Sequence, residues 1–329
     1  MTEQSPPLER ATPSTSATPN DVKPDDVMPS RFVIWWRAIR PATLWAGAAP
    51  VAVGAGLAAE LGTQWGWSEY LSLLGALVGA LLIQVGCNLI NDYADFEKGA
   101  DDETRLGPAR AAARGWLTSA DLKRGATLSL AAAGLIGVYL TWVGGWPILA
   151  LGVASLAAAY AYTAGPVPLA YWGLGDLFVI LFFGLGAVGG TTWLLTHQLN
   201  LEVGIAGSAV GCLAAAILVV NNLRDRHTDA RSDKRTLAVR FGATFARIEY
   251  TLLLIFAFIA VAVIGISQQR WGWCAPLICS PLAVVRIRQI WSLDGAPLNP
   301  LLGKTAQLEL IYCATLCIGL FYEASRAGV

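Results

Sequence analysis

Nine stretches of about 20 mainly apolar residues occupy most of the chain after residue 40. Backbone polar groups have no water to bind inside a bilayer, so each stretch is predicted to be a membrane-crossing helix. The predicted helices cover residues 41–60, 70–91, 120–142, 146–163, 174–195, 203–223, 244–266, 272–291 and 305–324. Only 14% of the residues are charged, against about 25% in soluble domains. We therefore expect an all-α integral membrane protein with nine transmembrane helices in a single bundle.

The remaining parts of the chain suggest a simple domain organisation. Residues 1–30 are rich in Ser, Thr, Pro and Asp and lack an apolar core, so they are predicted to be a disordered tail rather than a secretory signal. No long polar linker divides the rest of the chain. Residues 31–329 are accordingly expected to form one transmembrane domain.

The basic residues are distributed very unevenly between the two predicted membrane faces. Of the 23 Lys and Arg residues, only Arg270 and Arg326 fall on the side opposite the N-terminus. Because short basic loops remain in the cytoplasm, the N-terminus is predicted to be cytoplasmic. Such a bias directs the insertion of any membrane protein. It does not explain why acidic residues crowd into the same two cytoplasmic loops, after the second and sixth helices.

The first acidic cluster lies between Asn88 and Arg110, at the end of the second predicted helix. Its helical part places Asn88, Asn91, Asp92 and Asp95 on neighbouring stripes, because the spacings i, i+4 and i+7 bring side chains to one face. The loop that follows adds further charges, which are Lys98, Asp101, Asp102, Glu103, Arg105 and Arg110.

The second acidic cluster lies between Asn221 and Arg235, at the end of the sixth predicted helix. Asn222, Asp225 and Asp229 are spaced i, i+3 and i+7, and Asp233 follows four residues later. These side chains share one face if the helix continues. The basic residues that flank them are Arg224, Lys234 and Arg235.

Two carboxylate clusters at the same membrane face indicate a shared cation. Like charges at this spacing repel one another, and carboxylates near lipid are costly and usually functional. Hard oxygen ligands suit Mg²⁺, which commonly binds one or two carboxylates together with phosphate oxygens. The nearby Arg and Lys suit the remaining phosphate charge. The pattern predicts a diphosphate site built around Mg²⁺. The alternatives are a solvated loop of mixed charge and a cation transporter, although transporters place ionisable groups near the bilayer midplane.

These residues resemble the motifs of the UbiA superfamily of intramembrane aromatic prenyltransferases. Asn91, Asp92 and Asp95 match its NDxxD motif, and Asp225 and Asp229 match its DxxxD motif. The family's usual third aspartate falls at Gly99, so Asp101, Asp102 or Glu103 would have to complete the first motif. Closer similarity is to the 1,4-dihydroxy-2-naphthoate polyprenyltransferases of menaquinone synthesis, and it extends from residue 37 onward. It rests on RLGPAR, YTAGPVPLAYWGLGD, VNNLRDRHTDARSDKRTLAVR and PLNPLLGKTA.

The resemblance implies that Mg²⁺ bridges the aspartates and the diphosphate of a polyprenyl donor, and that the dihydroxynaphthoate ring attacks the allylic carbon with loss of CO₂. Catalysis is expected from Asp92, Asp95, Asp225 and Asp229, and metal binding from these four together with Asn91 and Asp101. The expected substrate-binding residues are Asn88, Asn91, Arg105, Arg110, Asn222, Lys234, Arg235 and Tyr160. For the basic residues among them, an equally good explanation is the positive-inside rule.

Several features allow two explanations. Tyr160 and Tyr162 could border the aromatic pocket or belong to an interfacial belt, and Asp176 could line a pocket or pair with a helix N-terminus. The glycines of the segment 173–190 favour close helix packing and could also leave a groove for the prenyl chain. The six cysteines lack metal-ligand spacing and are expected to fill apolar space.

The expected activity is therefore the transfer of a polyprenyl group to 1,4-dihydroxy-2-naphthoate, giving demethylmenaquinol. Transfer to 4-hydroxybenzoate or another aromatic acceptor is the alternative among enzymes, and a membrane transporter or quinone-binding protein is the alternative outside them. The expected partners are the two substrates and the lipid bilayer, with no nucleic acid. We expect the protein in the bacterial inner membrane, with its site and cap loops (92–119 and 224–243) on the cytoplasmic side.

Overall fold

The computed structural model describes residues 28–101, 106–166 and 168–328, and within these ranges the chain is helical and contains no strand. Most of the predicted tail lies outside the described residues. The N-terminal part comprises α1 (Arg31–Ile39), α2 (Pro41–Glu60), α3 (Trp67–Glu97), α4 (Ser119–Gly144), α5 (Trp146–Ala161) and the 3₁₀ turn η1 (Leu169–Trp172). Next come α6 (Gly175–Val179), the π-helical η2 (Ile180–Gly186), α7 (Ala187–Thr196), α8 (Leu201–Arg231) and α9 (Leu237–Ser267). The chain ends with η3 (Trp271–Cys279), α10 (Ser280–Ser292), η4 (Ala296–Leu298) and α11 (Asn299–Arg326).

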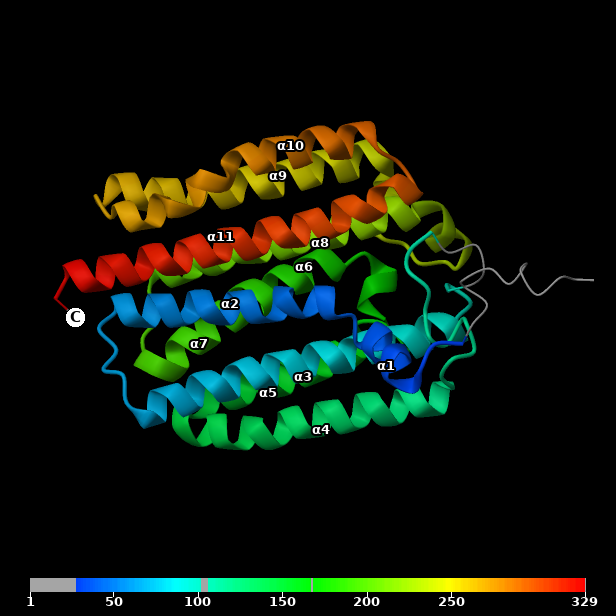
Figure 1. The fold of residues 1–329 in the computed structure, drawn as a ribbon, viewed down its shortest axis with the longest axis horizontal. Helices are drawn as coiled ribbons and strands as arrows, with labels where there is room; N and C mark the ends of the chain where they lie inside the picture. Colours follow the sequence, from blue (N-terminus) through cyan, green and yellow to red (C-terminus); the bar gives the residue numbers. More distant parts are fainter. Residues whose placement is uncertain (1–27, 102–105, 167, 329) are drawn as a thin grey trace, which may run out of the picture.

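The predicted membrane segments coincide with these helices. Within the described ranges, seven helical stretches are long and apolar enough to cross a membrane. They are α2, α3, α4, the continuous α6–η2–α7, α8, α9 and η4–α11. The other two predicted segments fall on α5, which has 16 residues, and on η3 followed by α10. The chain is thus a multi-pass membrane protein whose long helices lie side by side (Figure 1).

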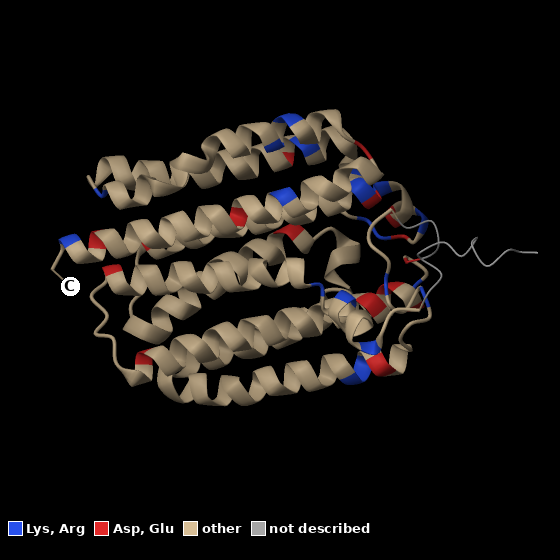
Figure 2. Cartoon of the chain, in the orientation of Figure 1, with Lys and Arg blue, Asp and Glu red and all other residues tan. Residues whose placement is uncertain are grey.

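Two helices extend well beyond the predicted apolar segments. α3 and α8 have 31 residues each, or about 46 Å at 1.5 Å per residue, whereas the hydrocarbon layer is about 30 Å thick. α9 also spans 31 residues, but the chain is kinked at Gly242, whose φ is 84°. Residues 92–97 and 224–231, which were expected in loops, therefore belong to α3 and α8. Their extra turns carry both acidic motifs to the end of the bundle where charged residues gather (Figure 2).

Local signals in the sequence set where these helices begin and end. The Asn200 side chain accepts a hydrogen bond from the Val203 amide at 3.0 Å and starts α8. α8 ends at Arg231, and Asp233 adopts a left-handed φ of 54° in the short connection to α9. Asp233 is consequently off the helical face that carries Asp225 and Asp229, contrary to the possibility that the helix continues.

Close contact between glycines joins the α6–η2–α7 segment to α8. A Cβ atom at Gly184 would meet the carbonyl oxygen of Gly207 and lie 2.7 Å from the Cα of Gly211. Backbone atoms cannot move aside as a flexible side chain can, so this approach requires glycine. Close packing therefore explains Gly184, whereas Gly186 and Gly190 line an apolar cavity.

We expect Gly184→Ala to lower the free energy of unfolding by about 1–3 kcal/mol, because the added methyl group forces α8 and η2 apart. Gly204→Ala is the matched control, since a Cβ at this position of α8 meets no atom within 4 Å. Thermal unfolding of the two purified variants in detergent measures the effect. Equal midpoints would contradict the packing explanation.

Two polar features of the fold were not anticipated. The short helix α1 precedes the first membrane helix, and its C-cap Arg40 has a left-handed φ of 53° before Pro41. In α11, Glu309 is 1% exposed, and its Oε1 atom has no hydrogen-bond partner among the described residues.

Candidate active site

A polar cavity of about 410 Å³ lies between the motif-bearing ends of α3 and α8. α2, α11 and the α6–η2 segment form further walls, and the connections after α3, α5 and α8 also contribute. The residues of the predicted site that line it are Asn91, Asp95, Arg110, Asn222 and Lys234. The fold thus brings both motif regions to a single cavity, as the sequence predicted.

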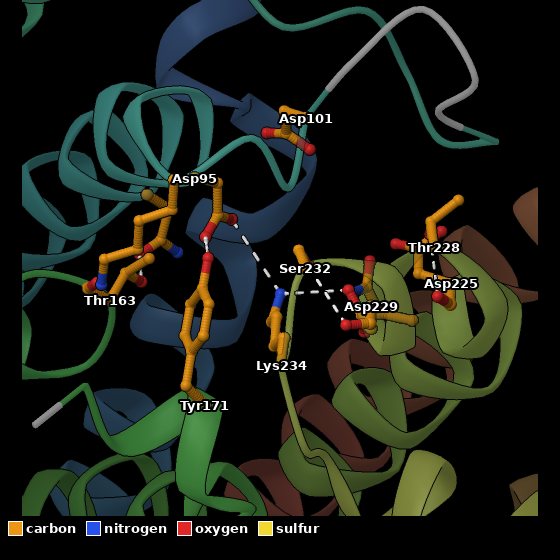
Figure 3. A network of polar contacts seen from close by, with 12 residues as sticks. Asp95, Asp101, Thr163, Tyr171, Asp225, Thr228, Asp229, Ser232 and Lys234 are labelled. Atoms are coloured by element: carbon orange, nitrogen blue, oxygen red, sulfur yellow. Dashed lines mark hydrogen bonds and ion pairs between the residues drawn. The ribbon is translucent and has the colours of Figure 1, made fainter.

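The second aspartate of each motif faces the other across one ammonium group (Figure 3). The Lys234 Nζ atom lies 3.5 Å from an Asp229 oxygen and 4.0 Å from an Asp95 oxygen. Both carboxylates are 4% exposed. The Oδ2 atom of Asp229 is buried and has no hydrogen-bond partner in the part of the chain that the structure describes. The ammonium group of Lys234 therefore lies between the two motifs. It also lines the cavity, where an anionic ligand can reach it.

Tyr171, in the 3₁₀ turn η1, holds the carboxylate of Asp95 in place. Its hydroxyl donates a hydrogen bond to an Asp95 oxygen at 3.0 Å, and its carbonyl accepts one from the Arg235 amide at 3.0 Å. Lys98 Nζ lies 4.5 Å from the centre of the Tyr171 ring. Burial, together with the Asp95 charge, raises the pKa of Tyr171, which keeps its hydroxyl a donor. Burial also lowers the pKa of Lys98, and Asp95 opposes that change.

The two motif asparagines have different surroundings. Asn91 lines the cavity, and its Oδ1 atom accepts a hydrogen bond from the buried Thr163 hydroxyl. Asn88 instead fixes the start of α2, because its amide donates to the Ile39 carbonyl and the Thr43 hydroxyl, both at 2.9 Å. Asn88 does not line the cavity, so the structure does not place it where the predicted contact with substrate would require.

The first aspartate of the NDxxD motif holds a loop. Asp92 is 1% exposed, and its two oxygens accept hydrogen bonds from the amides of Ala111 and Ala112, both at 3.1 Å. It does not line the cavity. The structure therefore separates Asp92 from Asp95, although the sequence placed both at the metal.

The first aspartate of the second motif is also engaged outside the cavity. Both oxygens of Asp225 accept hydrogen bonds from Arg224, at 2.7 and 2.5 Å. The same guanidinium donates to Asn299 at the start of α11, and Asn299 donates to the Leu106 carbonyl at 2.7 Å. This chain of contacts ties α8 and α11 to the loop that follows the first motif.

The third acidic position of the first motif falls in that loop. Asp101 is buried and pairs with Arg110, whose Nε atom lies 3.1 Å from a carboxylate oxygen. Arg110 in turn lines the cavity, and its buried Nη1 atom has no hydrogen-bond partner in the described part of the chain. The predicted contact of Arg105, and the alternatives Asp102 and Glu103, lie outside the described residues.

Two predicted substrate contacts face away from the cavity. The side chain of Arg235 is 66% exposed and pairs with Asp233 at 2.8 Å. Tyr160 is 52% exposed and lines no described cavity, whereas Tyr162, two residues later, lines the cavity. The structure thus favours the interfacial explanation for Tyr160 and the pocket explanation for Tyr162. Asp176 also lines the cavity rather than merely capping a helix.

Sequence reasoning missed Tyr171, Thr163 and Asn299. None has a fixed spacing from either motif, and each reaches the site only through the tertiary fold. The one signal available was that Tyr171 and Asn299 fall in segments with close similarity to one branch of the family. Arg40, which directly precedes α2, also lines the cavity and donates to the Asn88 carbonyl at 3.1 Å.

A second cavity of about 500 Å³ adjoins the first and is almost wholly apolar. α3, α4, α5 and the α6–η2–α7 segment contribute most of its walls. Both cavities share the wall residues Gln84, Tyr162, Val179 and Phe183. A ligand with a charged head and a long apolar tail would therefore find a suitable wall for each part.

The polar cavity also suits a hard divalent cation together with an anionic ligand. No group of three His, Cys, Asp or Glu side chains positioned to hold a metal occurs among the described residues. Mg²⁺ does not need one, since it commonly takes one or two protein carboxylates and completes its shell with phosphate oxygens and water. Asp95, Asp229 and the oxygen of Asn91 supply donors of that kind. The Asp229 Oδ2 atom, for which no described residue is a hydrogen-bond partner, is consistent with such a role.

The chain resembles known proteins in sequence over most of its length. Residues 47–305 match the model of the UbiA prenyltransferase family. The 1,4-dihydroxy-2-naphthoate octaprenyltransferases of Mycobacterium tuberculosis and Escherichia coli are 36% and 34% identical to it. They align with 88% and 89% of this chain, and with 98% and 96% of their own lengths. The Haemophilus influenzae protein of the same name is 33% identical, over 88% of this chain and 96% of its own.

The fold resembles solved membrane proteins. A UbiA homolog from Aeropyrum pernix K1 superposes with a TM-score of 0.64 at 14% identity, covering 84% of this chain and 97% of that one. A UbiA homolog from Archaeoglobus fulgidus gives 0.61 at 16% identity, with coverage of 88% and 99%. The matched sequence, the shared fold and the approach of both aspartate motifs to Lys234 at the wall of one cavity lead to the same conclusion: the chain belongs to the UbiA prenyltransferase family.

Proposed function

We propose that this protein transfers a polyprenyl group from its diphosphate to 1,4-dihydroxy-2-naphthoate, with loss of CO₂, to give demethylmenaquinol. The relatives with 33–36% identity are named as 1,4-dihydroxy-2-naphthoate octaprenyltransferases and align over nearly their whole length. The observation that carries the proposal is the pairing of Asp95 with Asp229 across Lys234. Asp95 and Lys234 line a polar cavity that adjoins an apolar one, and Asp229 lies behind Lys234.

Asp95, Asp229 and Asn91 would hold Mg²⁺ in this site. Once bound, the ion supplies positive charge that stabilises the leaving diphosphate. UbiA homologs from Archaeoglobus fulgidus have been solved bound to DMAPP or GPP and Mg²⁺, which supports a metal-dependent site in this fold. Asp101 and Asp225 remain predicted ligands, although each pairs with an arginine side chain here.

Several polar and charged groups of the cavity would bind the diphosphate. Lys234 and Arg110 contribute positive charge from opposite connections, and the buried Nη1 atom of Arg110 is available to donate to a phosphate oxygen. Asn222 adds an amide on the same wall. Preorganised donors of this kind stabilise charge that develops as the carbon–oxygen bond to diphosphate breaks.

The reaction itself requires little covalent chemistry from the protein. The diphosphate leaves with the electron pair of the carbon–oxygen bond, and the electron-rich ring supplies the pair that forms the new carbon–carbon bond. Loss of the ring carboxylate as CO₂ returns a pair to the ring. The protein must therefore hold donor and acceptor together and keep water from the allylic cation. The apolar cavity provides a dry wall for the polyprenyl chain.

The same geometry supports a specific arrangement in the membrane. The start of α2 and the C-terminus lie at opposite ends of the bundle (Figure 1), as an odd number of crossings requires. We propose nine crossings, with α5 and η3–α10 added to the seven long spans. The charged end of the bundle (Figure 2) would face the cytoplasm of a bacterial inner membrane, capped by the described parts of the connections after α3 and α8. Residues 31–329 would act as one domain.

An acceptor panel tests the proposed activity. We expect purified protein with Mg²⁺ and a polyprenyl diphosphate to prenylate 1,4-dihydroxy-2-naphthoate and to release one CO₂ per transfer. 4-Hydroxybenzoate, which lacks the second ring, should react far more slowly. Product mass spectrometry and trapping of labelled CO₂ provide the two readouts. Transfer only to 4-hydroxybenzoate would move the protein to the other aromatic class, and consumption of no donor with any acceptor would favour a non-enzymatic role.

A further inference from the structure

Asp92 is set apart from the other motif aspartates by what its oxygens bind. Both accept hydrogen bonds from consecutive backbone amides, those of Ala111 and Ala112, at 3.1 Å. These amides begin a compact turn, because the amide of Arg114 bonds to the Arg110 carbonyl and that of Trp116 to the Ala111 carbonyl. A carboxylate at the start of such a turn satisfies donors that would otherwise have no partner.

The contact is buried on all sides. Asp92 is 1% exposed, and Ala111 and Ala112 are 2% and 4% exposed. The alanines belong to an apolar cluster that includes Leu89 and Leu122, so the turn is packed against α3 and α4. Water has little access to replace Asp92 as an acceptor. A buried amide without a partner is costly, which makes the position of this turn depend on the carboxylate.

The turn places Arg110 at the wall of the cavity. Arg110 directly precedes the two anchored alanines, and it lines the polar cavity together with Asp95 and Lys234. The Nε atom of Arg110 lies 3.1 Å from an Asp101 oxygen. The Nη1 atom of Arg110 is buried and has no hydrogen-bond partner among the described residues. Asn299 fixes the same segment further upstream, by donating to the Leu106 carbonyl at 2.7 Å.

We infer that Asp92 is a positioning residue that anchors the turn after Arg110 and so presents that guanidinium to the donor diphosphate, rather than a ligand of the metal. The inference rests on the proposed function for the identity of the anion. It assigns different roles to the adjacent motif positions 91 and 92, since the Asn91 oxygen lies at the cavity and both Asp92 oxygens are engaged elsewhere. The two aspartates of NDYAD then act on different parts of the site.

The variant Asp92→Asn separates these roles in the full-length protein. Asparagine keeps the shape of the side chain but turns one acceptor into a donor facing a backbone amide. We expect the KM for the polyprenyl diphosphate to rise roughly 10- to 100-fold, in line with the loss of a buried hydrogen bond. The Mg²⁺ concentration for half-maximal activity should stay near the wild-type value. Hydrogen exchange in a peptide covering residues 106–117 should become faster, while exchange in the membrane helices is unchanged.

Arg110→Ala and the double variant complete the test. Arg110→Ala should reproduce the rise in KM with normal exchange in 106–117, and adding Asp92→Asn should raise KM little further. Asp121→Asn is the matched control, because Asp121 also accepts a backbone hydrogen bond, from Thr118 at 3.2 Å at the start of α4, away from the cavity. It should leave the donor KM unchanged.

Three results would overturn the inference. One is a Mg²⁺ requirement that rises in Asp92→Asn as it does in Asp95→Asn, with normal exchange in 106–117, since this would make Asp92 a ligand. Another is full additivity of Asp92→Asn and Arg110→Ala. The last is a normal donor KM in Arg110→Ala, which contradicts the inference whether or not Asp92→Asn accumulates. The hydrogen-exchange result does not depend on catalysis. If the wild-type protein proved inactive, the proposed function would be rejected, but the exchange measurement would still test whether Asp92 anchors the turn.

Discussion

Replacing Asp229 with alanine is expected to lower Mg²⁺-dependent prenyl transfer by roughly 10²- to 10³-fold, the usual effect of removing one charge-stabilising group from an active site. Asp95→Ala should have a similar effect, because the two carboxylates face the same cation position from α3 and α8. Loss of either removes one of the two carboxylates that face Lys234 and the proposed metal. Initial rates in membranes, normalised to the amount of folded protein, measure the effect.

The matched control for this prediction is Asp233→Ala. Asp233 lies in the same connection as Lys234, but its side chain is 80% exposed and pairs with the exposed Arg235. Its removal should change the rate less than about twofold, as an exposed ion pair contributes little. Near-normal activity in both Asp95→Ala and Asp229→Ala would show that the reaction does not depend on this carboxylate pair.

Filling the apolar cavity is expected to change which donors the enzyme accepts. Gly137 of α4 and Gly152 of α5 line this cavity, and a Cβ at either position meets no atom within 4 Å. A phenylalanine at residue 152 would therefore occupy space meant for the polyprenyl chain. Each buried methylene is worth about 0.8 kcal/mol, so excluding three of them lowers kcat/KM for a long donor roughly 50-fold. Geranyl diphosphate, which is short, should react at near the wild-type rate.

A donor series from geranyl to octaprenyl diphosphate measures this shift. Gly204→Phe is the control, since Gly204 lies in α8, lines neither cavity and also has open space around a Cβ. It should show the wild-type preference. If Gly152→Phe accepts octaprenyl diphosphate as well as the wild type does, the polyprenyl chain takes another route.

Much of the fold could be predicted because the membrane imposes few choices. Apolar runs of sufficient length must be helical in lipid, and every predicted segment overlaps a helix. Helix ends were harder, because hydropathy reports on lipid contact rather than on helicity. α3 and α8 continue through charged residues that a hydropathy argument assigns to loops. The helix α1 was missed for a related reason, since nine residues are too few to register as a membrane span.

The candidate site could be predicted in part. Helical spacing placed Asn91 and Asp95 on α3 and Asn222 on α8, and all three line one cavity, because periodicity and topology suffice for residues on two facing helices. Spacing cannot tell which carboxylates are engaged by the backbone. Asp92 and Asp95 are three residues apart on α3, yet one binds the amides of a loop and the other faces the cavity. That division depends on where residues 110–112 fold back, which no local pattern encodes.

Binding of a non-cleavable polyprenyl diphosphate analogue tests the central claim, that Asp95 and Asp229 form one Mg²⁺-dependent diphosphate site. Titration calorimetry in detergent should show binding to the wild type that requires Mg²⁺. Asp95→Asn and Asp229→Asn should each weaken it roughly 10- to 100-fold, by the cost of losing a charged hydrogen-bonded partner, and the double variant should be little worse than either, because the two residues act as one unit. Equal binding with and without Mg²⁺, unaffected by both substitutions, would contradict the claim.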